Sequence, residues 1–214
     1  MWCLEVRSFV KAAYALYLCL LVAGPASGEE AFPFLLPDQV RAAYETERRD
    51  WLPTTQIVKN AFIAAEDKNF YDLPARSTIT AGITRWYPHP ASRQSLAISF
   101  AIARALEPNE ILAWFVHGVF LGQGCFGVDG AAVAYFDKPS SELEIHEAAL
   151  LAALTPAPAR FHPIRAAAHT TERRNAVLRE MADLGMIRDH QARSAMASPL
   201  SVRTPLGTCP PSGH

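Results

Sequence analysis

An adjacent pair of acids, Glu66 and Asp67, is the first place in this sequence where side chains could do acid–base chemistry. Val58, Phe62 and Glu66 are spaced four residues apart, so in a helix Glu66 shares a face with two apolar side chains. Burial and a neighbouring like charge both raise a carboxyl pKa, which suits a glutamate to proton transfer near neutral pH. The alternative is an exposed helix end that carries two solvated acids.

The helix that carries Glu66 has sequence signals at both ends. Thr54 or Thr55 can cap its N-terminus, because a threonine hydroxyl accepts from the unpaired amides of the first turn. Leu73 and Pro74 are expected to stop it, since the residue before a proline disfavours helical backbone angles.

Apolar residues at helical spacing predict several further helices, and strand alternation is sustained nowhere, so we expect a mostly α fold. The predicted helices cover residues 91–106, 108–120, 146–154 and 171–183. The second of these is apolar nearly all round, which places it in the centre of the fold. A further helix can follow Pro37, although that stretch shows no chemistry.

Length and composition indicate one globular domain. The chain has 214 residues, half of them hydrophobic, and a net charge of −1, so it lacks the basic character of a nucleic-acid-binding protein. We divide it into a signal peptide (1–28), a leading segment (29–50), the domain (51–198) and a disordered tail (199–214), because that tail is rich in proline.

The N-terminus predicts secretion to the periplasm. Basic residues precede an apolar run over residues 12–23, and small residues follow at 26–28, where a signal peptidase would cut. The run is shorter than the roughly 20 residues of a membrane-spanning helix, although an uncleaved anchor at the inner membrane is the alternative. Cys125 and Cys209 could pair in that compartment, but two cysteines, one in a proline-rich tail, do not favour a structural disulfide.

Several sequence blocks, taken together, resemble the transglycosylase domain of glycosyltransferase family 51, which includes the peptidoglycan polymerases of penicillin-binding proteins. The first is Ala-Phe-Ile-x-x-Glu-Asp-x-x-Phe, from Ala61 to Phe70. The later blocks follow in the family's order, across residues 51 to 187: Ser77-Thr-Ile-Thr80, Glu110-Ile-Leu, Gly122-x-Gly-x-Phe-Gly-Val128, Tyr135-Phe136, Glu147-Ala-Ala-Leu-Leu-Ala152, Pro156 to Pro163, and Arg173-Arg-x-x-Val-Leu178.

The resemblance implies a lysozyme-like helical domain that polymerises lipid II into glycan strands. Glu66 would be the catalytic base for the acceptor sugar's 4-hydroxyl, and undecaprenyl pyrophosphate would leave. The implied substrate-binding residues are Asp67, Ser77, Thr78, Thr80, Arg85, Arg93 and Gly124. The residues implied to hold the motifs together are Phe70, Arg173 and Arg174. The hydroxyls have an alternative use in helix caps and turns, and the arginines in surface solvation.

Two departures from the family pattern matter for activity. Ser77 follows Asp67 after a short segment, which implies a reduced membrane-side lobe, and no Asp or Glu occurs between Ala81 and Leu106, where the family carries a second glutamate. A second hypothesis is therefore a degenerate member that binds glycan, lipid precursor or a cell-wall synthase partner. A third is lytic cleavage with Glu66 as general acid, against which the set of motifs argues.

Other polar residues give weaker indications of function. His117 stands where the family usually has asparagine, so it is either a cleft residue or a hydrogen-bonded core histidine. His146 and Glu147 begin like a zinc motif, but Leu150 occupies the place of the second histidine, so Glu147 is interpreted as structural. No cofactor is indicated, and a divalent metal has no support in the motifs. The expected partners are lipid II, the nascent glycan strand and a membrane surface, with no nucleic acid.

Overall fold

The computed structural model describes residues 36–86, 92–207 and 209. The predicted signal peptide and the start of the leading segment lie outside the described residues. Across these described ranges, no helix combines the length and the hydropathy needed to cross a membrane.

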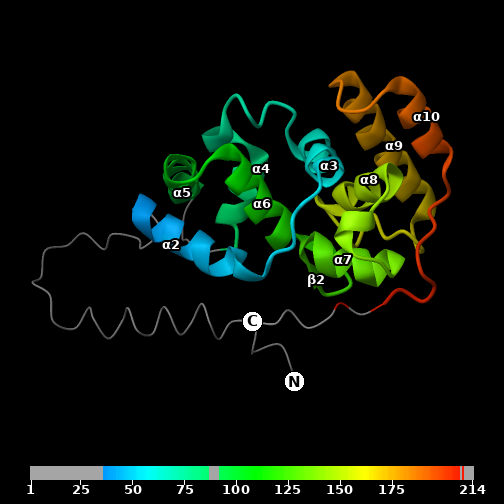
Figure 1. Ribbon diagram of the computed structural model, residues 1–214, viewed down its shortest axis with the longest axis horizontal. Coiled ribbons are helices and arrows are strands. Elements are labelled where there is room, and N and C mark those ends of the chain that lie inside the picture. The colour runs from blue at the N-terminus through cyan, green and yellow to red at the C-terminus, as the bar shows by residue number, and fades with distance from the viewer. Residues whose placement is uncertain (1–35, 87–91, 208, 210–214) are drawn as a thin grey trace, which may run out of the picture. The chain divides into compact units, whose positions relative to one another are not determined.

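Helices make up most of the described chain, so the mostly α class is confirmed (Figure 1). The α-helices are α2 (Pro37–Glu47), α3 (Gln56–Glu66), α4 (Thr78–Thr84), α5 (Ser92–Ala105), α6 (Pro108–Gly118), α7 (Gly127–Phe136), α8 (Ile145–Leu154), α9 (Ala167–Asp183) and α10 (Asp189–Ala197). Short 3₁₀ turns are η3 (Arg48–Asp50), η4 (Pro74–Arg76) and η5 (Ser140–Glu142). A two-stranded antiparallel hairpin joins β1 (Phe120–Gly122) to β2 (Cys125–Phe126).

Helix α8 lies at the centre of one group of helices. Every residue from Glu147 to Leu154 is buried, because alanine and leucine cover all its sides. It packs against α3 and α9, which also pack against each other, and α10 covers α9 (Figure 1). Full burial of a leucine side chain stabilises a fold by about 1.5–3 kcal/mol. This packing therefore fixes α3, the helix that ends at Glu66.

Helix α6 lies at the centre of a second group of helices, as its apolar surface predicted. It packs against α4, α5 and α7, while α2 packs against α5. Trp114 on α6 is buried, and its indole N–H donates to the Glu47 carboxylate at 2.6 Å. Arg41 on α2 pairs with Glu110 at 2.6 Å, which joins α2 to the first turn of α6.

Two sequence predictions about local structure are wrong. Helix α3 ends at Glu66 rather than near Pro74, because Asp67 adopts extended angles (φ −161°, ψ 101°) and its carboxylate accepts from the Asn69 amide at 3.0 Å. The helix predicted to run to Phe120 ends at Gly118, and β1 follows. A hairpin of two and three residues is too short to show alternation in the sequence.

Gly127 shows why the chain can turn from β2 into α7. Its φ is +76°, which L side chains rarely adopt, and a Cβ there would collide with the His117 carbonyl. The Gly127 amide donates to the Val119 carbonyl at 2.8 Å, so this close approach also ties the hairpin to the end of α6.

The segment after α10 packs against α7, so the prediction of a disordered tail is wrong for residues 199–207 and 209. The Arg203 amide donates to the Tyr135 carbonyl at 2.8 Å, and the Gly207 amide donates to the Ala134 carbonyl at 2.9 Å. Val202 and Leu206 pack against the core. Residues 208 and 210–214 lie outside the described part of the chain.

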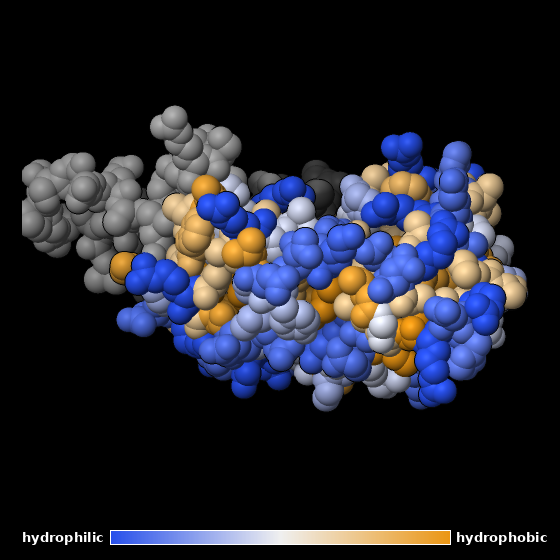
Figure 2. All heavy atoms as spheres, turned by 90° about the horizontal axis from the view of Figure 1, so that it is seen from above, coloured by the Kyte–Doolittle hydropathy of each residue, from blue (hydrophilic) through white to orange (hydrophobic). Residues whose placement is uncertain are grey.

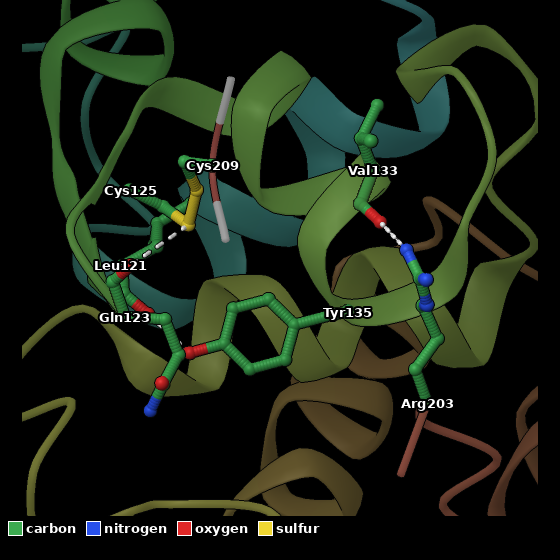
Figure 3. Close-up of a disulfide and its surroundings, with 7 residues drawn as sticks. All are labelled: Leu121, Gln123, Cys125, Val133, Tyr135, Arg203 and Cys209. Carbon is green, nitrogen blue, oxygen red and sulfur yellow. Dashed lines mark hydrogen bonds between the residues drawn. A yellow bond between two sulfur atoms is a disulfide. The ribbon is translucent and has the colours of Figure 1, made fainter. Parts of the chain in front are cut away.

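Cys125 and Cys209 form a disulfide with a Cα–Cα distance of 5.3 Å (Figure 3). The sequence did not favour this pair. The bridge joins buried Cys125 on β2 to the end of the segment that lies along α7. Beside it, the Tyr135 hydroxyl donates to the Leu121 carbonyl at 2.8 Å, and burial raises the pKa of Tyr135 to about 12, so the phenol stays neutral.

Arg174 joins α9 to the end of α10. Its side chain is buried, and its guanidinium donates to the carbonyls of Met196 at 3.0 Å and Ser198 at 2.8 Å. A buried guanidinium needs such partners, because an unpaired buried charge is costly.

Replacing Cys209 by serine should lower the free energy of unfolding by about 2–4 kcal/mol, because the bridge closes a long loop in the unfolded chain. The two cysteines are 84 residues apart. Urea unfolding of the full chain under oxidising conditions measures the change. Adding a reductant should destabilise the wild type by a similar amount and leave Cys209→Ser unaffected; equal sensitivity of both to reductant would contradict the prediction.

Candidate active site

Glu66 is the last residue of α3, and its side chain is half-buried. Thr55 caps the start of this helix by accepting from the Val58 amide at 3.4 Å. Val58 and Phe62, on the same face, are fully buried against the neighbouring helices. The packing of this face therefore brings the Glu66 carboxyl group partly out of water, as the spacing predicted.

One hydrogen-bond partner and two positively charged side chains favour the ionised form of the Glu66 carboxyl group. The Thr155 hydroxyl, directly after α8, donates a hydrogen bond to Glu66 Oε1. Arg173 on α9 and Arg85 at the end of α4 lie near enough for their positive charges to act on it. Burial raises the pKa of Glu66, and this effect outweighs the opposing effects of the Thr155 hydrogen bond and the two arginines. The site thus holds a carboxyl group with increased proton affinity beside two cations.

Arg173 has a different environment from the one the sequence suggested. Its guanidinium carbon lies 5.6 Å from the centre of the Phe161 ring, and its buried Nε has no hydrogen-bond partner among the described residues. The family resemblance groups Arg173 with Arg174 as a residue that holds the fold together. In the structure Arg173 contacts the Phe161 ring, and its positive charge also acts to lower the pKa of Glu66.

The hydroxyls of the Ser77 block are engaged in local structure. Ser77 is buried and caps α4 by accepting from the Ile79 amide at 3.1 Å, and buried Thr80 donates to the Pro74 carbonyl at 2.6 Å. Exposed Thr78 donates to the backbone carbonyl of Glu66 at 2.8 Å. Helix caps and turns, the alternative use of these hydroxyls, therefore account for the contacts of all three. Thr78 also joins the start of α4 to the end of α3.

The other predicted substrate ligands are placed as follows. Arg85 is exposed, while the Arg93 side chain lies outside the described part of the structure. Gly124 forms the hairpin turn with φ +77° and open space where a side chain would be. Asp67 follows Glu66, and its negative charge helps to raise the pKa of Glu66. Phe70 is fully buried.

His117 has the contacts of a core histidine. Its ring stacks on Trp51 at 4.8 Å, its Nε2 lies 2.9 Å from the Thr54 hydroxyl, and its Nδ1 lies 3.1 Å from Asp129. Burial acts to raise the pKa of Asp129, but hydrogen bonds from His117 and Ser140 outweigh it and lower that pKa. Of the two interpretations left open by the sequence, the structure supports the core histidine.

Two acids that belong to the family's motifs, Glu110 and Glu147, make structural contacts. Glu110 accepts from the Glu107 amide at 2.8 Å in a capping box, and the hydrogen bond from Arg41 keeps its pKa below the usual value. Glu147 pairs with Lys138 at 2.6 Å, in keeping with a structural role. Within the residues that the structure describes, no group of three histidines, cysteines or acids could hold a metal ion.

The loop after α8 connects the Glu66 site to the hairpin. Buried His162 accepts at Nδ1 from the amides of Ile164 and Arg165, both at 3.2 Å, and burial lowers its pKa, so the ring is neutral. Its Nε2 then carries the proton and lies 3.0 Å from the Gln123 amide group. The Gln123 atom at this distance is Nε2, so the side-chain amide of Gln123 has to be turned over for its oxygen to accept from His162 Nε2.

The sequence missed Thr155, which is the direct hydrogen-bond partner of Glu66. The two residues are 89 positions apart, and no spacing pattern connects them. The sequence gives only an indirect indication of a role for Thr155: this hydroxyl residue follows a mostly apolar predicted helix and precedes a proline-rich loop.

The fold and the site together define a helical domain with a partly buried glutamate beside two arginines. A family model described as Transglycosylase matches residues 76–182, which include Arg85, Thr155 and Arg173 and begin after Glu66. The chain therefore belongs to the transglycosylase family.

Curated relatives include penicillin-binding protein 1A of Rickettsia bellii, 31% identical over 75% of this chain, and that of Aquifex aeolicus, 32% identical over 68%. The chain spans 24% of the length of each. A crystal structure of penicillin-binding protein 1A from Haemophilus influenzae aligns with a TM-score of 0.49 at 27% identity, over 70% of this chain and 17% of that one.

Replacing Glu66 by glutamine should stabilise the fold at neutral pH by up to about 1 kcal/mol. The folded-state pKa is raised, so wild-type stability attributable to this group is full below the unfolded-state pKa and falls as pH rises through the folded-state pKa. The advantage of Glu66→Gln should therefore grow as pH rises above the unfolded-state pKa and level off above the folded-state pKa. Urea unfolding of both proteins at several pH values measures it; a difference in stability between variant and wild type that stays constant or falls as pH rises would contradict the prediction.

Proposed function

We propose that this protein is a peptidoglycan glycosyltransferase that joins lipid-linked disaccharides, with Glu66 as the general base. The observation that carries the proposal is the partly buried Glu66 carboxyl group, with raised pKa, beside Arg85 and Arg173. Membership of the transglycosylase family and the likeness to penicillin-binding proteins 1A support the choice of reaction and substrate. Secretion to the periplasm, which the N-terminal sequence predicts, would bring the protein to this substrate.

In the proposed reaction, ionised Glu66 takes the proton of the acceptor sugar's 4-hydroxyl. The oxygen forms a bond to the anomeric carbon of the growing strand, and the bond from that carbon to undecaprenyl pyrophosphate breaks. A positioned base contributes about 10²–10⁴-fold to the rate. Arg85 and Arg173 would offset the negative charge on the departing pyrophosphate, since guanidinium groups pair well with phosphate oxygens.

A lipid-linked substrate requires access from a membrane surface. Exposed apolar side chains occur directly before η4, at Leu73, and on α5, at Leu96 and Phe100. Figure 2 shows hydrophobic residues interrupting the polar surface on the face that it presents. Leu73 lies in the segment between Glu66 and η4, and α5, which carries Leu96 and Phe100, packs against η4. We propose this region as the side from which the lipid-linked sugar approaches.

A second candidate function is a family member that binds glycan, lipid precursor or a synthase partner without polymerising it. The observation that favours it is the lack of any acid between Ala81 and Leu106, together with the structural contacts of Glu110 and Glu147. Two arginines that act electrostatically on the same site could hold an anionic ligand without turning it over.

Glu66→Gln should lower polymerisation of labelled lipid II at least 100-fold, because the amide cannot accept the 4-hydroxyl proton. The measurement is the rate of glycan-strand formation by the full chain in detergent, with Asp183→Asn on α9 as an acid-to-amide control. Asp183→Asn should polymerise lipid II at the wild-type rate, because Asp183 is exposed.

The outcomes separate the two candidate functions. Polymer from wild type and Asp183→Asn but not from Glu66→Gln supports the glycosyltransferase. No polymer from folded wild type, with saturable binding of lipid II that Glu66→Gln retains, supports the binding protein instead. Equal polymerisation by wild type and Glu66→Gln would exclude Glu66 as the base.

Arg173→Gln should raise the KM for lipid II and lower kcat/KM about tenfold or more, because one of the two cations proposed for the pyrophosphate is lost. Arg179→Gln, on the exposed side of the same helix, is the matched control and should leave kcat/KM within a factor of two or so of wild type. Equal losses of kcat/KM in both variants would show a nonspecific effect of charge. An unchanged kcat/KM in Arg173→Gln would show that Arg173 does not bind the pyrophosphate.

A further inference from the structure

The position of the Thr155 hydroxyl gives it two possible acceptors. It lies within hydrogen-bond distance of Glu66 Oε1 and, at 2.9 Å, of the Ala152 carbonyl in the last turn of α8. A hydroxyl has one proton, so it cannot donate to both at once. Which of the two accepts must depend on whether Glu66 itself carries a proton.

The hydrogen bonds can be satisfied in both protonation states of Glu66. When Glu66 is ionised, Thr155 donates to its carboxylate. When Glu66 is protonated, its own O–H donates to Thr155 Oγ1, and Thr155 turns its proton to the Ala152 carbonyl. The carboxyl group can thus take up and release a proton without losing its neighbour or changing position.

We propose that Thr155 is the positioning residue of Glu66, holding its carboxyl group in place in both states and favouring the ionised one. Thr155 acts through Glu66 and is not assigned a contact with substrate. Its effect on turnover rests on the proposed glycosyltransferase function, whereas its effect on the proton affinity of Glu66 does not.

The scaffold around Thr155 suits this role. Thr155 directly follows α8, whose last residues are completely buried, and its amide donates to the Ala152 carbonyl at 3.3 Å. Helix α3, which ends at Glu66, packs directly on α8. Both partners are therefore held by helices that pack directly on each other, which is what a fixed hydrogen bond to a reacting group requires.

The direction of the effect follows from the strengths of the two hydrogen bonds. A bond to an ionised carboxylate is roughly twice as strong as one between neutral groups. Thr155 therefore lowers the pKa of Glu66 and opposes the rise caused by burial, in the same direction as the charges of Arg173 and Arg85. Asp67 is the neighbouring acid that acts the opposite way. The balance leaves Glu66 with increased proton affinity while keeping the ionised form accessible.

The test is a direct titration of Glu66 by ¹³C NMR in the full chain labelled at the glutamate carboxyl carbon, with Glu66→Gln identifying its resonance. Thr155→Val, which keeps the shape but lacks the hydroxyl, should raise the pKa of Glu66 by about one unit. Thr155→Ser should titrate as wild type. Thr46→Val is the matched control, because Thr46 is exposed on α2 and its hydroxyl donates to the Ala42 carbonyl of the same helix at 2.8 Å.

Lipid II polymerisation supplies the second readout. At a pH well below the wild-type midpoint of Glu66, Thr155→Val should polymerise about tenfold more slowly than wild type, and the deficit should shrink as pH rises through the two midpoints, while Thr155→Ser stays near wild type. A purely structural role for Thr155 would lower the rate equally at all pH values and leave the titration of Glu66 unchanged.

The outcomes distinguish this inference from the proposed function. If wild type makes no polymer at any pH, the glycosyltransferase proposal fails, and the NMR titration still decides the role of Thr155. An unchanged Glu66 titration in Thr155→Val, or an equal shift in Thr155→Ser, would overturn the inference. If Thr155→Val does not fold, Thr155→Ala lacks the same hydroxyl in a smaller side chain and is subject to the same criteria.

Discussion

The packing of α3 against α8 is the constraint on which the candidate site depends. It buries the face of α3 that carries Val58 and Phe62, and so removes the carboxyl group at the end of that face partly from water. The same packing brings Thr155, at the end of α8, into contact with Glu66. Helix α9 lies against both helices and adds Arg173. The apolar contacts that stabilise the fold therefore also determine the proton affinity of Glu66.

The balance around Glu66 suits proton transfer. Burial alone would strongly favour the neutral acid, whereas the Thr155 hydrogen bond and the positive charges of Arg85 and Arg173 favour the carboxylate. A base works best when its pKa lies near the pH at which it acts, because it is then both ionised and basic enough. Holding an ionised carboxyl group in such surroundings lowers the stability of the fold, as is common at functional sites.

The sequence predicted those features that depend on local pattern. The helical class, the cap at Thr55 and the placement of Glu66 on a buried face follow from spacing and hydrogen-bonding chemistry along one helix. The features that it missed depend on contacts between distant segments. Thr155 meets Glu66 across 89 residues, and Arg173 differs from its neighbour Arg174 only in the side of α9 from which it projects. The Cys125–Cys209 bridge likewise depends on where the chain returns along α7.

The pH dependence of lipid II polymerisation by the wild-type chain would test the role of Glu66 most directly. If Glu66 is the base, the rate should rise with pH along an acid limb whose midpoint lies above 4.5 and coincides with the NMR titration of the Glu66 carboxyl group. A polymerisation rate that does not change across the titration of Glu66 would contradict its assignment as the base.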